Sequence, residues 1–159
     1  MIEIRKMHKD DLKNVLKWRN SNIVRQSMLN KEIIKWEEHL KWFEKCQNDD
    51  RITNLIVDKD KKTIGVVNIM ANDIESKSCS WSIYLAEEQG KGLGTAMGFA
   101  VIDYIKNILK LKKIYVQVLK ENLISVAFHR KIGFSLINET SINVKERSVD
   151  IFNMEMNID

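Results

Sequence analysis

The alternation of apolar and polar positions along the chain predicts its strands. Residues 2–5 alternate and predict a short first strand. Residues 53–57 and 63–71 are apolar and partly β-branched, and the charged residues 58–62 between them predict an antiparallel hairpin. Residues 78–85 alternate small polar with larger side chains, which predicts one more strand in the same meander.

Helices are predicted where apolar residues recur at spacings of three and four. Asp10 or Asp11 is placed to cap a first helix, which ends in the turn-forming residues 18–22. A last helix over residues 122–131 ends at Gly133, because glycine readily adopts the left-handed conformation that closes many helices. The apolar positions of the first helix are Leu12, Val15 and Leu16, those of the second are Ile33, Trp36, Leu40 and Phe43, and those of a long third helix include Ala96, Phe99, Ile102, Ile105 and Leu109.

The order of these elements predicts the fold class. A strand and two helices precede the three-stranded meander. A helix, a strand over residues 113–119, a helix and two strands over residues 134–137 and 149–156 follow it. Helices that alternate with a mostly antiparallel sheet give a mixed α/β (α+β) class. At 159 residues, the chain is expected to form one domain over residues 1–159.

Composition narrows the function classes. With 44% hydrophobic and 30% charged residues, the chain is neither a disordered segment nor a low-complexity fibre. Its apolar runs are too short to cross a bilayer and its N-terminus lacks a signal peptide, so we expect a cytoplasmic protein with no membrane partner. Cys46 and Cys79 are too few for a disulfide scaffold, and the three histidines lie too far apart for a metal site, so no metal is expected.

The balance of charge bears on the partner. The formal net charge is only +4, and basic residues are interleaved with acids rather than gathered in a stripe. This pattern argues against a nucleic-acid partner. A modest positive field suits a small anionic ligand, which it concentrates without non-specific binding.

Glycine is clustered in a way that predicts a backbone-based site. The chain has no proline and six glycines, of which Gly90, Gly92, Gly94 and Gly98 fall within nine residues. They lie between a predicted strand and a predicted helix, where free first-turn amides and the helix dipole favour a phosphate. Neither the Walker A loop nor the dinucleotide fingerprint is matched, because Thr95 follows Gly94. The alternative is that these glycines only allow a helix and a strand to pack closely.

The stretch Gln89-Gly90-Lys91-Gly92-Leu93-Gly94 matches the pattern Gln/Arg-x-x-Gly-x-Gly/Ala. With it, and with Asn122, Ser125, Phe128 and Gly133-Phe134 further on, the chain resembles the GCN5-related N-acetyltransferase (GNAT) family. The resemblance implies a mostly antiparallel sheet with helices on both faces, and an enzyme that takes acetyl-coenzyme A (acetyl-CoA) as co-substrate. It also implies that the backbone around Tyr84 pairs with the pantetheine arm while the glycine loop holds the pyrophosphate. The cofactor-binding residues carried over in this way are Ile83, Leu85, Gln89, Gly90, Lys91, Gly92, Leu93, Gly94, Thr95, Asn122 and Phe128.

His129 is the departure from the family pattern. It stands where the family often has a tyrosine that protonates the leaving thiolate. A tyrosine is protonated at neutral pH, whereas a histidine with the ordinary pKa of about 6.5 is mostly not. His129 is therefore an imidazolium held by an anion, a neutral hydrogen-bond donor, or a histidine on the helix surface near the site. Tyr84 and Ser78 are the other candidates for contact with the reacting groups.

The N-terminal half is expected to bind the acceptor amine. The stretches Trp18-Arg19-Asn20, Glu37-Glu38-His39-Leu40 and Ser76-Lys77-Ser78-Cys79 resemble segments of one subfamily. This subfamily comprises the UDP-4-amino-4,6-dideoxy-N-acetyl-β-L-altrosamine N-acetyltransferases of pseudaminic acid biosynthesis. The resemblance implies direct acetylation of the 4-amino group of a nucleotide-linked aminosugar. Arg19, Asn20, His39 and Lys77 are the candidate substrate-binding residues. The alternatives are an ion pair on its own helix for Arg19 and a packed, hydrogen-bonded position for His39.

Elementary chemistry is consistent with that acceptor. A sugar amine flanked by oxygens is less basic than an alkylamine of pKa about 10.4, so it needs only a weak base or a water chain. The chain shows no acidic cluster suited to a polycation. The alternatives are a protein N-terminus, a small amine such as a polyamine or antibiotic, or a non-catalytic module that binds acetyl-CoA. The oligomeric state is left open, with a homodimer among the options.

Overall fold

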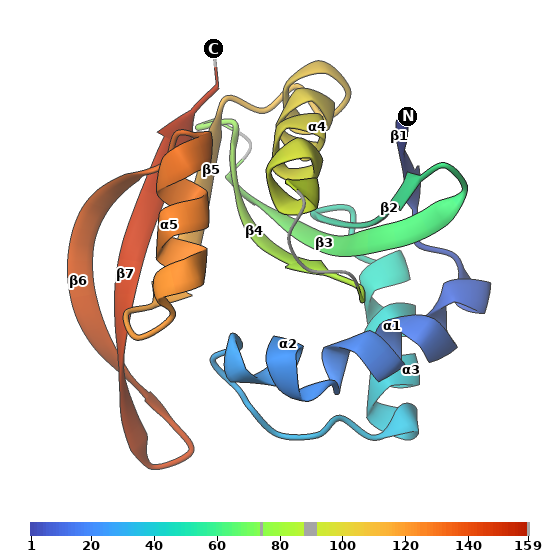
Figure 1. The fold of residues 1–159 in the computed structure, drawn as a ribbon, viewed down its shortest axis with the longest axis horizontal. Coiled ribbons are helices and arrows are strands. Elements are labelled where there is room, and N and C mark those ends of the chain that lie inside the picture. Colours follow the sequence, from blue (N-terminus) through green and yellow to red (C-terminus); the bar gives the residue numbers. More distant parts are fainter. Residues whose placement is uncertain (74, 88–91, 159) are drawn as a thin grey trace.

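A central sheet organises the computed structural model, which describes residues 1–73, 75–87 and 92–158. Within these residues the sheet has seven strands in the order β1-β2-β3-β4-β5-β7-β6 (Figure 1). Every neighbouring pair is antiparallel except β4 and β5, which run parallel. The mixed, mostly antiparallel class is confirmed. The strands are β1 (Ile2–Lys6), β2 (Ile52–Lys59), β3 (Lys62–Asp73), β4 (Ser78–Leu85), β5 (Lys113–Leu119), β6 (Ser135–Val144) and β7 (Arg147–Asn157).

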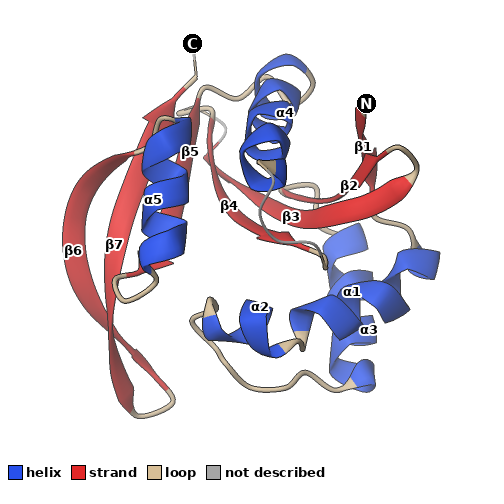
Figure 2. Cartoon of the chain, in the orientation of Figure 1, coloured by secondary structure: helices blue, strands red, loops and turns tan. Residues whose placement is uncertain are grey.

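Helices cover both faces of the sheet (Figure 2). On one face, apolar side chains of α4 and α5 pack with those of the central strands in the larger core. On the other face, a second core joins α1, α2 and α3 to Ile56 of β2, Val66 of β3 and Tyr84 of β4. The helical elements are η1 (Lys9–Asp11), α1 (Leu12–Arg19), α2 (Asn22–Gln26), α3 (Trp36–Gln47), α4 (Leu93–Asn107) and α5 (Leu123–Ile132).

The alternation in β4 places its side chains on both faces. Trp81 and Ile83 pack into the core with α4 and α5, whereas Tyr84 packs into the core with α1 and α3. A strand with a period of two residues must divide its side chains in this way. Because β4 is central, it contributes to both cores, and residues from either side of it can reach one site.

Three expectations about the elements are corrected. The turn predicted over residues 18–22 leads directly into a further short helix, α2, whose first turn is capped by the Ser21 hydroxyl accepting from the Val24 amide. Ile33 is not on a helix but is 65% exposed, and α3 begins only at Trp36. β6 extends to Val144, well past the predicted residue 137, and most of its residues are exposed. An edge strand with two solvated faces has no hydrophobic alternation to reveal its length.

Two hairpins close with turns of two residues that have positive φ. Asp60 and Lys61 join β2 to β3 with φ of 51° and 67°, and Lys145 and Glu146 join β6 to β7 with φ of 48° and 66°. Positive φ at both positions defines the type I′ turn, whose twist matches that of the strands. The predicted hairpin of β2 and β3 is confirmed, with longer strands and a tighter turn.

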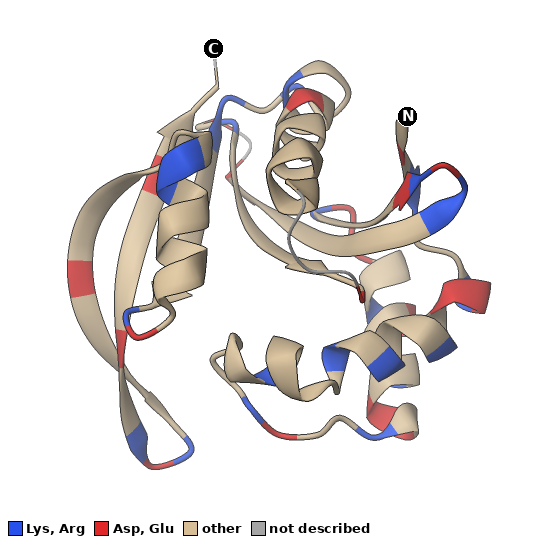
Figure 3. Cartoon of the chain, viewed as in Figure 1, with Lys and Arg blue, Asp and Glu red and all other residues tan. Residues whose placement is uncertain are grey.

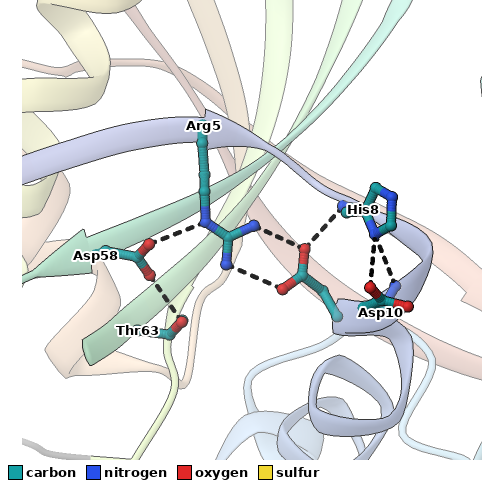
Figure 4. Close-up of polar contacts among 6 residues, drawn as sticks. Arg5, His8, Asp10, Asp58 and Thr63 are labelled. Atoms are coloured by element: carbon teal, nitrogen blue, oxygen red, sulfur yellow. Dashed lines mark hydrogen bonds and ion pairs between the residues drawn. The ribbon is translucent and has the colours of Figure 1, made fainter. Parts of the chain in front are cut away.

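The N-terminal strand is anchored by a charged cluster (Figure 4). The Arg5 guanidinium donates to Asp58 at 2.9 Å and to both carboxylate oxygens of Asp11 at 2.8 and 2.9 Å. Thr63 donates to the second oxygen of Asp58 at 2.7 Å. Burial raises the pKa of Asp11, but the hydrogen bonds from Arg5 and from the His8 amide outweigh it and lower the pKa overall. The cluster ties β1, η1, β2 and β3 together at the edge of the sheet.

Candidate functional site

The site lies where two parallel strands separate. β4 and β5 are paired only from Ser78 with Lys113 to Ser80 with Tyr115. Beyond Ser80, none of the described strands pairs with this side of β4. A cavity of about 640 Å³ occupies the gap. Its lining comes from β4 (residues 80–83), β5 (residues 115–118), α5 (Ser125 and His129), β7 (Asn153 and Met154), the end of α1 (Arg19) and the segment after α2 (residues 27–30).

The cavity passes from one face of the sheet to the other. Trp81 belongs to the core on the α4–α5 side, whereas Tyr84 belongs to the core on the α1–α3 side. Since side chains alternate along β4, the lining residues Trp81 and Ser82 face opposite sides. The gap between β4 and β5 therefore opens to both faces of the sheet. A donor bound on the α4–α5 side can meet an acceptor bound on the α1–α2 side within this gap.

The start of α4 has the features of a phosphate cradle. Gly92 is the N-cap residue, has φ of 72°, and makes no side-chain capping bond, so first-turn amides of the helix have no cap from it. The first two turns of α4 carry no charged side chain that would compete for these amides (Figure 3). Leu93, Gly94 and Thr95 form this turn, whereas Gln89, Gly90 and Lys91 lie outside the described residues.

The clustered glycines serve two different purposes. A Cβ on Gly98 would lie 3.1 Å from Phe128 Cζ and 3.2 Å from Ile132 Cδ1, so this glycine lets α4 and α5 approach. A Cβ on Gly92 would meet nothing within 4 Å, and only its left-handed backbone requires glycine. Packing therefore explains Gly98, whereas backbone conformation at the start of α4 explains Gly92.

Asn122 and Phe128 hold α5 in place beside the cavity. The Asn122 side chain accepts a hydrogen bond from the Ser125 amide at 3.1 Å and caps α5. This bond gives Asn122 a structural role at the start of α5. The Phe128 ring lies edge-on to His129, with ring centroids 4.9 Å apart, and packs close to Gly94 and Gly98 of α4.

His129 is a buried, neutral histidine. Its Nε2 accepts a hydrogen bond from Trp81 Nε1 at 3.1 Å, which leaves the ring proton on Nδ1 to be donated to the Ser125 carbonyl at 2.8 Å. Burial lowers the pKa of His129 to about 4, although the bond to Ser125 opposes this shift. The expectations of an imidazolium and of a surface histidine are both wrong. His129 does line the cavity, but its one N–H is bound to its own helix.

The other two catalytic candidates do not line the cavity. The Tyr84 phenol is buried in the core with α1 and α3, where burial raises its pKa well above the usual value despite the nearby Arg19. Ser78 is buried at the joined end of β4 and β5, and its hydroxyl shares a hydrogen bond of 2.8 Å with Ser76. Of the neighbouring residues of β4, Ile83 lines the cavity, and the Leu85 side chain lies beside Gly94 in the first turn of α4.

Arg19 is the one predicted substrate-binding residue that lines the cavity. Its Nη2 donates to the Asn30 carbonyl at 3.1 Å, whereas its Nη1 is buried and has no hydrogen-bond partner among the described residues. Burial lowers the pKa of Arg19, and Tyr84 opposes that effect. Nη1 of Arg19 is also the sole buried side-chain nitrogen or oxygen in the described part of the chain that lacks a partner.

The other three predicted substrate residues lie outside the lining of the cavity. Asn20 clamps the backbone of Ile34, donating to its carbonyl at 2.9 Å and accepting from its amide at 2.8 Å. His39 is buried, its Nε2 lies 3.1 Å from the Leu12 carbonyl, and its ring stacks on Trp42. Lys77 sits in the turn before β4 with φ of 51°, at the end where β4 and β5 are joined. None of the three is among the residues that line the cavity.

Sequence reasoning missed the polar wall of the cavity. Ser80, Ser82, Gln117 and Asn153 bring neutral hydrogen-bonding groups to it from three strands. The alternation of β5, in which Val116 and Val118 are buried and Gln117 is exposed, is the signal that could have indicated one of them. Among the described lining residues, Arg19 carries the single permanent charge and no carboxylate is present. The described chain also has no group of three or more histidine, cysteine, aspartate or glutamate residues that could hold a metal ion.

Comparison with known proteins decides the family. The family model described as an acetyltransferase (GNAT) domain matches residues 2–135. The chain belongs to the GNAT acetyltransferase family. It is therefore an N-acetyltransferase that uses acetyl-CoA. Two features of the described residues fit that co-substrate: the edge of β4 beyond Ser80, which none of the described strands pairs with and which suits a pantetheine arm, and the start of α4, where Gly92 makes no side-chain capping bond and the amides suit a pyrophosphate.

Several acetyltransferases are similar to this GNAT domain. It is 28% identical over 133 residues to acetyltransferase PseH of Campylobacter jejuni, covering 84% of this chain and 82% of the relative. It is 27% identical over 152 residues to spermidine N(1)-acetyltransferase of Escherichia coli, covering 92% and 82%. The crystal structure of spermidine N-acetyltransferase from Vibrio cholerae in complex with CoA and spermine has the same fold, with a TM-score of 0.89, 24% identity, and coverage of 99% of this chain and 95% of that one. None of the described helices of this chain is long and apolar enough to span a membrane.

Proposed function

We propose that this N-acetyltransferase acetylates the 4-amino group of a UDP-linked 4-amino-4,6-dideoxy-sugar. The observation that carries the proposal is the charge of the cavity, whose described lining has Arg19 and no carboxylate. A polyamine brings several positive charges, and two like charges 4 Å apart repel by about 4 kcal/mol at an effective dielectric constant of 20. Such a cavity suits an acceptor that is neutral or anionic away from its amine.

The polar wall supports a hydroxyl-bearing acceptor. Ser80, Ser82 and Gln117 offer neutral donors and acceptors, which match the hydroxyl and acetamido groups of a sugar. Among the described residues that line the cavity, none has the negative charge needed to pair with a second ammonium. The similarity to acetyltransferase PseH also supports this acceptor.

The acid–base properties of the lining favour a weakly basic amine. An alkylamine of pKa about 10.4 must give up its proton before it can attack, at a cost of roughly 4–5 kcal/mol at pH 7. The described lining contains no carboxylate base, and His129 accepts from Trp81 through the one lone pair that could take the proton. An amine on a sugar ring, flanked by electron-withdrawing oxygens, is less basic, so a water chain is enough to deprotonate it.

The chain contributes binding and orientation to the transfer itself. Acetyl-CoA supplies the acetyl group as a thioester. The edge of β4 over residues 81–85 would hold the pantetheine arm, and a backbone amide of Tyr84 or Leu85 would stabilise the oxyanion that forms on the carbonyl. The first turn of α4 would hold the pyrophosphate. With His129 neutral and fully bonded, water or the acceptor amine returns the proton to the leaving thiolate.

Acetylation of a polyamine is the second candidate. It is favoured by the 27% identity to the E. coli spermidine N(1)-acetyltransferase over 92% of this chain. The charge of the cavity opposes it, so the two candidates differ in a property that an assay can measure.

An acceptor panel tests the proposal directly. The purified protein is incubated with acetyl-CoA and, separately, a UDP-linked 4-aminosugar, spermidine, and a peptide with a free N-terminus. Release of free thiol measures turnover, and mass spectrometry locates the added acetyl group. We expect the aminosugar to give the largest kcat/KM and the acetyl group to be on its 4-amino nitrogen. A larger kcat/KM for spermidine would overturn the proposal, and no thiol release with any amine would indicate a module that only binds acetyl-CoA.

A further inference from the structure

The guanidinium of Arg19 is only partly used by the protein. Its Nη2 is bound to the Asn30 carbonyl at 3.1 Å, while its Nη1 is buried without a partner among the described residues. A guanidinium carries five N–H donors in a rigid fork, and a buried donor left unbonded destabilises the folded protein. Because Arg19 lines the cavity, a ligand atom there could accept the hydrogen bond that Nη1 does not donate to the described residues.

The charges around Arg19 leave its own charge unbalanced. The groups that act on it are the buried, neutral Tyr84 phenol and a second cation, Arg25, whose Nε donates to the Lys31 carbonyl. Among the described carboxylates, Glu32 pairs with Lys145, Glu121 pairs with Lys31, and Glu87 accepts from the Trp18 indole. No carboxylate is among the described residues that line the cavity with Arg19. The positive charge of Arg19 is therefore not balanced by any described carboxylate in the cavity, and an anionic ligand group could pair with it.

We propose that Arg19 forms an anion subsite at the α1–α2 end of the cavity, where its free Nη1 binds an anionic oxygen, of a phosphate or a carboxylate, on the acceptor. This inference rests on the proposed function, since it assigns the part of the acceptor that lies away from the amine. An arginine fork binds such oxygens through charge-assisted hydrogen bonds, which are stronger in a partly buried site. The subsite would orient the acceptor so that its amine points through the gap between β4 and β5.

Binding and kinetics of Arg19→Met test the subsite. The acceptors are a UDP-linked 4-aminosugar, the same aminosugar without phosphate, and an amine that bears a carboxylate. UDP alone serves as a ligand in calorimetry, without acetyl transfer. We expect Arg19→Met to weaken UDP binding and to raise the KM of an anionic acceptor by about 10- to 100-fold, the range for one charge-assisted hydrogen bond. We expect less than threefold change for the phosphate-free sugar. Arg19→Lys keeps the charge without the fork and is expected to give an intermediate loss.

Arg51→Met is the matched control, because Arg51 is exposed and pairs with Asp49 outside the cavity. It makes the same change in charge and is expected to leave UDP binding and KM unchanged. An equal loss with the phosphate-free sugar would assign Arg19 to holding the Asn30 segment and overturn the subsite. An unchanged KM for the nucleotide sugar would also overturn it while leaving the proposed acceptor intact. UDP binding that depends on Arg19, without acetylation of any nucleotide sugar, would keep the subsite and overturn the proposed acceptor. A preference for the carboxylate-bearing amine would identify a carboxylate as the natural anion.

Discussion

Replacing His129 with glutamine should remove a large part of the sensitivity of this fold to acid. His129 is 3% exposed, accepts from Trp81 and donates to Ser125, so the folded state holds it neutral with a pKa of about 4. In the unfolded chain its pKa returns to about 6.5. As pH falls below 6.5, the unfolded state takes up a proton that the folded state takes up only near pH 4, and stability is lost over that interval.

The two pKa values determine the size of the effect. Linkage between a pKa of about 6.5 when unfolded and about 4 when folded gives a loss of roughly 2 kcal/mol at pH 5 and roughly 3 kcal/mol at pH 4. Above pH 7 the contribution is complete and constant. These losses are large beside the 5–15 kcal/mol typical of a whole domain, so about pH 5 should be a practical lower limit for work with this protein.

Urea unfolding at pH 7.5 and pH 5 measures this effect in the wild type and in His129→Gln. The other titrating groups, including the buried His39, are common to both proteins and cancel in the comparison. We expect the free energy of unfolding of the wild type to fall by about 2 kcal/mol more than that of the variant between the two pH values. Glutamine can still accept from the Trp81 indole, and the loss of the ring contacts with Phe128 and Phe134 lowers stability equally at both pH values.

The low pKa of His129 also predicts how kcat/KM depends on pH. Because His129 does not titrate above pH 5.5, the profile of kcat/KM between pH 5.5 and 8 should show no ionisation that disappears in His129→Gln. Equal pH dependence of stability in the two proteins, or a ring titration near 6.5 by NMR, would refute the reasoning. A kinetic limb near pH 6.5 that is lost with the histidine would restore it as a general acid.

Three further predictions concern the effects of single substitutions on stability. Gly98→Ala should be less stable than Gly94→Ala by about 1 kcal/mol in thermal unfolding, because the added Cβ lies 3.1 Å from Phe128 at the first site and 3.8 Å at the second; equal stability would contradict this account. Asn122→Ala should lose about 1 kcal/mol in urea unfolding, whereas Asn122→Asp keeps the cap and should lose little. Glu146→Gly should gain about 1 kcal/mol by relieving its φ of 66°, while Ser148→Gly in the adjacent strand should lose a comparable amount; two losses would show that the turn is not strained.

The parts of the structure predicted correctly are those encoded by neighbours in sequence. The alternation of β4 and the glycine at the start of α4 each work through a few consecutive residues. The roles of other polar residues depend on distant partners. His39 lies beside the Leu12 carbonyl, and Asn20 bonds to the backbone of Ile34. The sequence does not show whether a polar side chain will form its hydrogen bonds with the backbone of a distant segment.

The two sides of the site also differ in whether neighbouring or distant residues form them. Arg19 lies on α1, but its ability to bind a ligand depends on other segments. The Asn30 carbonyl binds Nη2, and the described lining of the cavity offers no carboxylate to Nη1. The cofactor side uses backbone amides and an exposed strand edge, which a short motif can specify. The acceptor side is assembled from α1, the segment after α2, and three strands, so small changes in any of them alter its charge. Members of this family with the same fold and different acceptors are the expected result, and the unpaired nitrogen of Arg19 is the feature of this chain that argues against a polycation.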